Sequence, residues 1–326
     1  MPPIGLGEEL PAWRAMVAHL DAASVYWDDR SLVGKLARSC TPTLHIQAAQ
    51  EWDDDPLAAY LDAVKSGCAP NTQRFVLGSH SHAGVVYDPF ANTVPSKLLR
   101  DYLDRYLKDE PVDIDSVPNV QFYLSNEGKW HAAPAWRASG ATMELFFAGG
   151  NALAAHAPVN TSTLGYSVDP AADDPCDAGF GGWLQMRSEP TETPIDIVGR
   201  AEIVLYLSVD TPDGDVFASL YDVSSAGDYS LVHLSQLRLR YRHSYSQPER
   251  MTVGAVEAVR IELPAVATRI VAGHHLELFL AGASCGAAEN PNTGGSISDE
   301  ESTLRSTTTI FSDPTRPSRI RLPTLE

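Results

Sequence analysis

The stretch Thr43–His82, TLHIQAAQEWDDDPLAAYLDAVKSGCAPNTQRFVLGSHSH, decides how this chain folds. Its two apolar runs, Thr43–Ala49 and Arg74–Leu77, have the composition of buried strands. Between them, Pro56–Lys65 repeats its apolar side chains at helical spacing. A strand, a helix and a second strand in this order predict a parallel α/β unit.

Polar side chains follow both predicted strands, where the chain leaves the sheet. Residues just past the carboxyl ends of parallel strands line the crevice in which α/β enzymes hold their ligands. Asp54 follows the first strand and His82 the second, so a carboxylate and an imidazole are expected to meet there. In this order they are the acid and the base of a Ser-Asp-His triad. Asp53, Asp55 and His80 are alternatives, and an aspartate in this turn is also explained as a helix N-cap.

The rest of the chain changes character along its length. Residues 41–141 continue the α/β pattern with an amphipathic helix, Pro95–Lys108, and a strand, Val120–Ser125. Residues 142–326 lose helical periodicity, and short β-prone runs alternate with turns rich in Gly, Pro, Asp and Ser. The expected fold class is therefore α/β plus all-β, ending in a jelly-roll-like β-sandwich. The strands expected there are Met143–Phe147, Ala201–Val209, Val216–Val223, Leu231–Arg242, Ala255–Leu263 and His275–Ala281.

The composition excludes several classes of function. The 326 residues include 24 basic and 42 acidic side chains, which gives a formal net charge of −18. So acidic a surface argues against binding to nucleic acid or anionic membranes, which require clustered Lys and Arg. No apolar run approaches the roughly 20 residues of a membrane span. No signal peptide is visible, so the cytoplasm is the expected location. Neither a metal site nor a cofactor is predicted.

The cysteines are few for so long a chain. Cys40, Cys68, Cys176 and Cys285 do not form the dense framework of a disulfide-stabilised secreted domain. Cys40 and Cys68 each precede a strand of the predicted parallel pair, so both are expected near one edge of the sheet. A bridge between them is sterically conceivable, but free thiols are expected in the cytoplasm.

Three segments of the decisive stretch resemble the second half of the catalytic domain in the cocaine esterase / X-prolyl dipeptidyl-peptidase family of α/β-hydrolases. They are Pro42–Ile46, Trp52–Asp54 and Phe75–His82. In the resemblance, Asp54 matches the triad acid and His82 the triad histidine. The chain departs from the family where Gln50 and Glu51 replace a glycine before Trp52, and where Ser79 and His80 replace a Pro-Trp pair.

The resemblance extends to both flanks. Residues 1–40 are similar to the end of the family's helical cap and its linker, and residues 41–141 to the C-terminal half of its α/β-hydrolase domain. Residues 142–326 are similar to its jelly-roll domain. The matching segments there are Tyr166–Pro170, Gly181–Gly182, Phe217–Val223, Leu237–Arg242, Gly273–Leu276, Asn290–Thr293 and Pro317–Pro323.

A triad hydrolase also needs a serine on a tight strand-to-helix turn of the Gly-x-Ser-x-Gly kind. Gly165-Tyr-Ser-Val-Asp169 approaches this pattern but has no closing glycine, while Ser79 and Ser81 lie on the histidine's own loop. In the family, the nucleophile lies upstream of the part that this chain resembles. We therefore expect a fragment or split product of a serine hydrolase, inactive alone, whose complete form hydrolyses small esters or releases X-Pro dipeptides.

Two kinds of partner follow from this interpretation. One is the small ester or peptide substrate, and the other is a complementary N-terminal hydrolase chain or a second copy that covers the incomplete sheet. An alternative belongs to a different class: a non-catalytic β-sandwich module for binding or oligomerisation, with a vestigial hydrolase segment.

Overall fold

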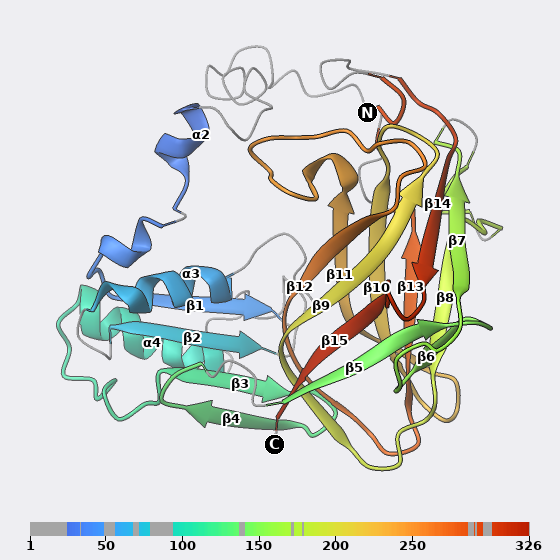
Figure 1. Cartoon of the computed structure of the whole chain (residues 1–326). Coiled ribbons are helices and arrows are strands. Elements are labelled where there is room, and N and C mark those ends of the chain that lie inside the picture. Colours follow the sequence, from blue (N-terminus) through green and yellow to red (C-terminus); the bar gives the residue numbers. More distant parts are fainter. Residues whose placement is uncertain are drawn as a thin grey trace.

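The computed structural model describes residues 25–32, 34–48, 56–67, 72–78, 94–136, 141–170, 173–177, 179–285, 290, 292–295 and 302–325. The chain is mostly β-sheet with few helices, and its strands form two sheets that lie side by side (Figure 1). We call the four-stranded sheet the small sheet and the eleven-stranded sheet the large sheet.

The small sheet has the order β1-β2-β3-β4, with β1, β2 and β3 parallel and β4 antiparallel. Alternate side chains of β2 face opposite ways, and each side is covered by one helix. This two-sided cover explains why β2 is buried along its whole length. The strands are β1 (Thr43–Ala48), β2 (Gln73–Gly78), β3 (Val120–Leu124) and β4 (Lys129–Ala133). The helices are α2 (Val25–Arg30), α3 (Pro56–Ala63) and α4 (Val94–Leu107). The α3 side packs Leu57, Tyr60, Phe75 and Leu77, and the α4 side packs Val76, Leu98, Tyr102 and Ile114.

The large sheet has the order β11-β10-β13-β8-β6-β5-β15-β9-β14-β7, and β12 also pairs with β9. All its pairings are antiparallel except the one between β6 and β8. It curls around one hydrophobic core that draws residues from most of its strands (Figure 1). Its strands are β5 (Ala141–Ala148), β6 (Ala152–Ala154), β7 (Ser162–Val168), β8 (Trp183–Ser188), β9 (Ile195–Val209), β10 (Asp215–Val223), β11 (Tyr229–Arg238), β12 (Glu257–Ile270), β13 (His275–Ala281), β14 (Ser306–Ser312) and β15 (Arg319–Thr324).

The two sheets meet where β3 ends and β12 passes. Ser125 forms a parallel β-bridge with Thr268: its amide donates to the carbonyl of Ala267 (3.1 Å), and its carbonyl accepts from the amide of Arg269 (2.9 Å). Ala265 and Ala267 of β12 pack in the same cluster as α3 and β2. The small and large sheets therefore share buried apolar surface as well as backbone hydrogen bonds.

Most elements expected from the sequence are present. The parallel strands, both helices and the strand after the second helix lie within a few residues of the predicted bounds, and β13 matches residue for residue. The apolar stripe of α4 is only partly a core stripe, because Leu103 and Leu107 are exposed. The sequence did not predict β6, β7, β8, β14 and β15 as separate strands.

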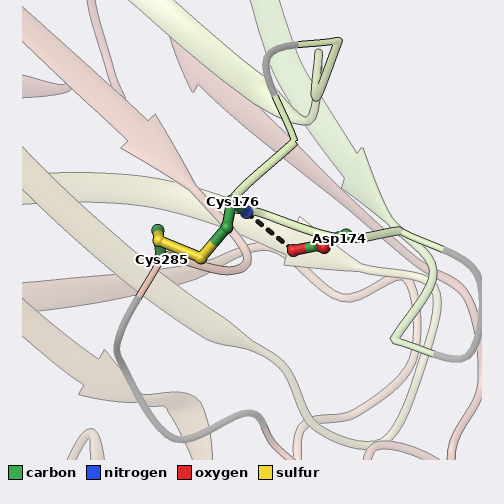
Figure 2. The surroundings of a disulfide bond; sticks show 3 residues. All are labelled: Asp174, Cys176 and Cys285. Atoms are coloured by element: carbon green, nitrogen blue, oxygen red, sulfur yellow. Dashed lines mark hydrogen bonds between the residues drawn. A yellow bond between two sulfur atoms is a disulfide. The ribbon is translucent and has the colours of Figure 1, made fainter.

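The expectation of free thiols is wrong for the described cysteines. Cys176 and Cys285 form a disulfide with Cα atoms 4.7 Å apart, and the amide of Cys176 donates to Asp174 Oδ1 (2.8 Å; Figure 2). The cause lies in strand pairing: Ala281 at the end of β13 lies opposite Trp183 at the start of β8, so the flanking loops meet. Cys40 is also disulfide-bonded, whereas Cys68 lies outside the described residues.

Removing the Cys176–Cys285 bridge is expected to destabilise the chain. The bridge spans 109 residues, and a loop of that length restricts the unfolded chain strongly. A Cys176→Ser/Cys285→Ser double variant should lose about 2–4 kcal/mol of unfolding free energy, measured by urea denaturation without reductant. Dithiothreitol added to the double variant then isolates the effect of the Cys40 bridge. Equal urea midpoints for the double variant and the parent would contradict the expectation.

Strand β11 of the large sheet carries a buried histidine. His233 of β11 is 1% exposed, and neither ring nitrogen makes a well-formed hydrogen bond to any described residue. Burial lowers the pKa of His233 to about 4 from its ordinary 6.5, with only a small opposing effect from the Leu234 backbone. The ring is therefore neutral in the folded protein over most of the pH range in which the unfolded chain takes up a proton.

This histidine should make stability fall in acid. Because its folded pKa is depressed, its contribution is complete above about pH 6.5 and is lost as the pH falls towards 4. The gap between about 4 and the ordinary 6.5 corresponds to about 3 kcal/mol and to one proton taken up on unfolding. Urea denaturation at pH 7, 5.5 and 4 should show this slope in the parent and a shallower one in His233→Phe. The exposed His156→Phe variant is the control and should keep the parent's slope.

Candidate active site

The predicted acid and base are not among the described residues. Asp54 and His82, and the alternatives Asp53, Asp55 and His80, all lie in the ranges that the structure leaves out. Their contact therefore stays a prediction. The described residues do fix the two points from which these segments start.

Those starting points are level with each other. β1 and β2 are parallel and in register from Thr43 opposite Gln73 to Ala48 opposite Gly78. Both strands end at this last pair. The segment that carries Asp54 and the segment that carries His82 thus leave the sheet from adjacent positions at its carboxyl edge.

The distances along the chain allow the two side chains to meet. Asp54 is six residues beyond Ala48, and His82 is four residues beyond Gly78. An extended chain covers up to about 3.5 Å per residue, and adjacent strands lie about 4.8 Å apart. Both segments are longer than the gap between the strands, so a hydrogen bond of ordinary length between Asp54 and His82 is within reach.

Strand β2 is held in place by a buried arginine. Arg74 has no exposed surface, and its guanidinium donates to the carbonyls of Ile114 (2.6 Å) and Val117 (2.5 Å). These carbonyls belong to the segment that connects α4 to β3. The pKa of the Arg74 guanidinium is lowered from its ordinary value, mainly because the group is buried. The side chain thereby ties β2, which leads to the histidine segment, to the crossover beside it.

Strand β1 is held from the other side, by the large sheet. Gln47, one residue before the end of β1, is buried and donates from Nε2 to the carbonyl of Ala265 in β12 (3.0 Å). Two residues earlier in the strand, His45 Nε2 lies 3.4 Å from the side-chain oxygen of Gln73, and burial lowers the pKa of His45. The carboxyl edge of the small sheet therefore lies against β12.

The chain contains one Gly-x-Ser-x-Gly sequence, Gly282-Ala-Ser284-Cys-Gly286, which was not among the predicted site residues. Its position does not fit a nucleophile elbow. Ser284 follows β13 of the large sheet, and its neighbour Cys285 is bonded to Cys176. Gly282 has a packing role, because a Cβ atom there would lie 2.6 Å from Cγ1 of Val168. The spacing of the serine and the two glycines is enough to find this motif in the sequence. Only the fold shows that its role is structural.

Within the described ranges, no group of His, Cys, Asp and Glu side chains is placed to hold a metal ion. In the same ranges, no helix is both long and apolar enough to cross a membrane.

Residues 113–321 match the family described as the X-Pro dipeptidyl-peptidase C-terminal non-catalytic domain. The chain belongs to this family. The match covers well over half of the 326 residues and confirms the family resemblance seen in the sequence. Thr43–His82 lies before the matched range, so this family match does not include the decisive stretch.

A curated relative reaches further towards the N-terminus of this family member. Cocaine esterase from Rhodococcus sp. (strain MB1 Bresler) is 24% identical over 347 aligned positions, which cover 92% of this chain and 59% of the esterase. The uncovered 8% amounts to about 26 residues, fewer than the 42 that precede Thr43. The alignment therefore spans the stretch with Asp54 and His82. The chain spans less than two thirds of the length of this relative.

Solved structures of other proteins show the same fold. An α-amino acid ester hydrolase has a TM-score of 0.84 at 23% identity, with 98% of this chain and 61% of that chain covered. An aminopeptidase from the marine sediment archaeon Thaumarchaeota archaeon has a TM-score of 0.83 at 20% identity, with coverage of 98% and 60%. A CocE/NonD family hydrolase from Staphylococcus aureus has a TM-score of 0.76 at 15% identity, with coverage of 97% and 59%.

The role of Arg74 can be measured by replacement. Arg74→Met keeps the apolar stem but removes the guanidinium donors of the Ile114 and Val117 carbonyls, and of these two Ile114 still accepts from the amide of Val117 (3.2 Å). A buried carbonyl that loses its donor costs about 1–3 kcal/mol. The unfolding free energy should fall by about 2–4 kcal/mol. Lys97→Met on exposed α4 surface is the control and should change it by less than about 0.5 kcal/mol. A loss no larger in Arg74→Met than in Lys97→Met would show that the buried guanidinium is dispensable.

Proposed function

We propose that this chain carries the acid and the base of a serine hydrolase that cleaves small acyl esters or X-Pro peptides. The observation that carries the proposal is the register of β1 and β2, which starts the Asp54 and His82 segments from adjacent positions. The alignment with cocaine esterase through this stretch supports it. So does the fold shared with an α-amino acid ester hydrolase.

In the proposed reaction, Asp54 accepts a hydrogen bond from the His82 ring and fixes its tautomer. His82 removes the proton from a serine hydroxyl as that serine attacks the acyl carbonyl, and then returns the proton to the leaving group. Water hydrolyses the acyl-enzyme in the same way, with His82 again as base. We place the serine outside this chain, because Ser284 lies in a loop of the large sheet closed by a disulfide.

The free edge of β1 gives the serine-bearing segment a place to join. In the described part of the chain, β1 pairs with β2 alone, so its other edge presents unpaired backbone groups. We propose that a complementary N-terminal hydrolase segment pairs there, with self-association as the alternative. On this proposal, residues 41–141 are the C-terminal half of an α/β-hydrolase domain and residues 142–326 are a jelly-roll domain.

The composition predicted a cytoplasmic location, and the disulfides lead us to propose a different compartment. Stable disulfides are rare in the cytoplasm and common where the surroundings are oxidising. The Cys176–Cys285 bridge and the bonded Cys40 therefore favour an oxidising compartment over the cytoplasm.

Paired substitutions test the acid and the base. This chain should be co-expressed with the reading frame, continuous or adjacent, that supplies the serine, and assayed with p-nitrophenyl acetate. His82→Gln and Asp54→Asn should each lower kcat by about 10⁴-fold, because the triad acts as a unit. The matched controls His80→Gln, Asp53→Asn and Asp55→Asn should stay within a few-fold of the parent. A large loss in a control instead of its partner would reassign that role, and full activity in every variant would overturn the proposal.

The isolated chain provides a second arm of this test. Without the partner segment it should not hydrolyse p-nitrophenyl acetate, and a fluorophosphonate probe should not label it. Stoichiometric labelling at Ser284 would show that the nucleophile lies in the large sheet, contrary to the proposal. A Ser284→Ala variant distinguishes that labelling from reaction at another serine.

One observation favours a second function, that of a non-catalytic module. The matched family describes residues 113–321 as non-catalytic, and this range includes most of the large sheet. If no serine-bearing reading frame accompanies the chain, a binding role of the large sheet is the remaining candidate.

A further inference from the structure

A wide cavity opens at one end of the large sheet. Its volume is about 770 Å³, within the usual range of small-molecule sites. Its lining includes Asn151, the end of β8 at Arg187–Glu189, the turn Ser224–Gly227, and Tyr229 and His275. Five strands of the sheet, β6, β8, β10, β11 and β13, thus contribute to its walls.

A fully buried carboxylate organises one wall. Glu277 of β13 has no exposed surface, and both of its oxygens accept hydrogen bonds. Arg187 Nε donates to Oε1 (2.6 Å), and His275 Nε2 lies 3.1 Å from the same oxygen. Gln185 Nε2 (2.6 Å) and the Tyr229 hydroxyl (2.7 Å) donate to Oε2. One carboxylate therefore fixes side chains from β8, β11 and β13.

The wall also has an aromatic part. The ring of Tyr229 packs edge-to-face against the ring of Tyr221, with the centroids 5.7 Å apart. Its centroid lies 6.4 Å from that of Phe279. Tyr229 nevertheless remains 49% exposed. A ring that is held at its hydroxyl, supported by two other rings and still open to solvent is a rigid apolar platform.

The charges around the cavity disfavour anionic ligands. Although burial alone raises the pKa of Glu277, its four hydrogen-bond donors outweigh this and lower that pKa to about 2. Glu277 is therefore ionised and is paired with Arg187. The remaining charged side chain of the lining is Glu189, which is exposed. Because Arg187 and Glu277 neutralise each other, Glu189 leaves a negative charge in the lining that disfavours an anionic ligand.

Hydrogen-bonding capacity remains after this pairing. Arg187 uses Nε and Nη2 on Glu277 and also interacts with Tyr229, yet its side chain stays 61% exposed in the lining of the cavity. The side chain of Asn151 adds a donor and an acceptor, and Glu189 adds acceptors. Fixed donors and acceptors beside an exposed ring match a ligand that has hydroxyl groups on its edge and C–H groups on its face.

We propose that this cavity binds a neutral polyhydroxylated ligand, a sugar residue at the end of a short oligosaccharide. Its apolar face lies on the Tyr229 ring, and its hydroxyls bond Arg187, Asn151 and Glu189. Glu277 touches no ligand and acts as a positioning residue for Arg187 and Tyr229. This proposal does not depend on the proposed hydrolase activity.

Saturation-transfer NMR on the full chain tests the site with maltose, cellobiose, lactose and xylobiose as probes. At least one should give a saturable signal, weakened at least 10-fold in affinity by Tyr229→Ala and by Arg187→Ala. Tyr229→Phe keeps the ring and should retain most of the binding. The matched controls are Tyr245→Ala, exposed elsewhere on the large-sheet part, and Arg260→Ala, from an exposed ion pair. Both should bind as the parent does.

Three outcomes would overturn the proposal. They are no saturable signal from any of the four sugars, equal affinity in the Tyr229→Ala and control variants, and tighter binding of glucuronate or glucosamine than of the neutral sugars. Far-ultraviolet circular dichroism of each variant checks that the fold is kept. If Tyr229→Ala fails to fold, the Arg187→Ala and Arg260→Ala pair still decides the question.

Discussion

Strand β12 is shared by two hydrophobic cores, and the arrangement of the whole chain depends on this. Val259 and Ile261 face the core of the large sheet, whereas Ala265 and Ala267 pack with Phe75 of the small sheet. The register of β12 against β9 shifts between Glu262 and Ala265. A bulge of this kind turns the strand, so that side chains two apart come to lie on opposite sides. Small side chains after the bulge let the small sheet approach closely.

The same contact positions the candidate active site. Gln47 near the end of β1 donates to the carbonyl of Ala265, and Ser125 at the end of β3 is bridged to Thr268. The strand ends from which the Asp54 and His82 segments begin are therefore held by the large sheet as well as by their own helices. On the proposed function, the non-catalytic domain serves catalysis by fixing this edge.

Two buried polar clusters of the large sheet differ in what surrounds them. Asp213 is fully buried and is bonded by Arg240, Arg250 and Asn290, next to a cavity of about 20 Å³, which suits one water molecule. Such a cluster satisfies its own charges and stabilises a loop. The Glu277 cluster borders open space of about 770 Å³ instead. The surroundings, rather than the hydrogen bonds, distinguish a structural network from a candidate binding site.

The sequence by itself determined the local elements and the family. Periodicity within Thr43–Leu77 and Pro95–Lys108 is a property of neighbouring residues, so the parallel unit and its helices could be predicted. The Asp54 and His82 assignments came from the same short-range order and remain predictions, because those residues lie outside the described ranges. The tertiary structure alone decided that Cys176 bonds Cys285, that Ser284 lies in a packed loop, and that Glu277 gathers side chains from three strands. These contacts join residues up to 109 positions apart. They depend on which strands pair and in what register, and no local pattern encodes that pairing.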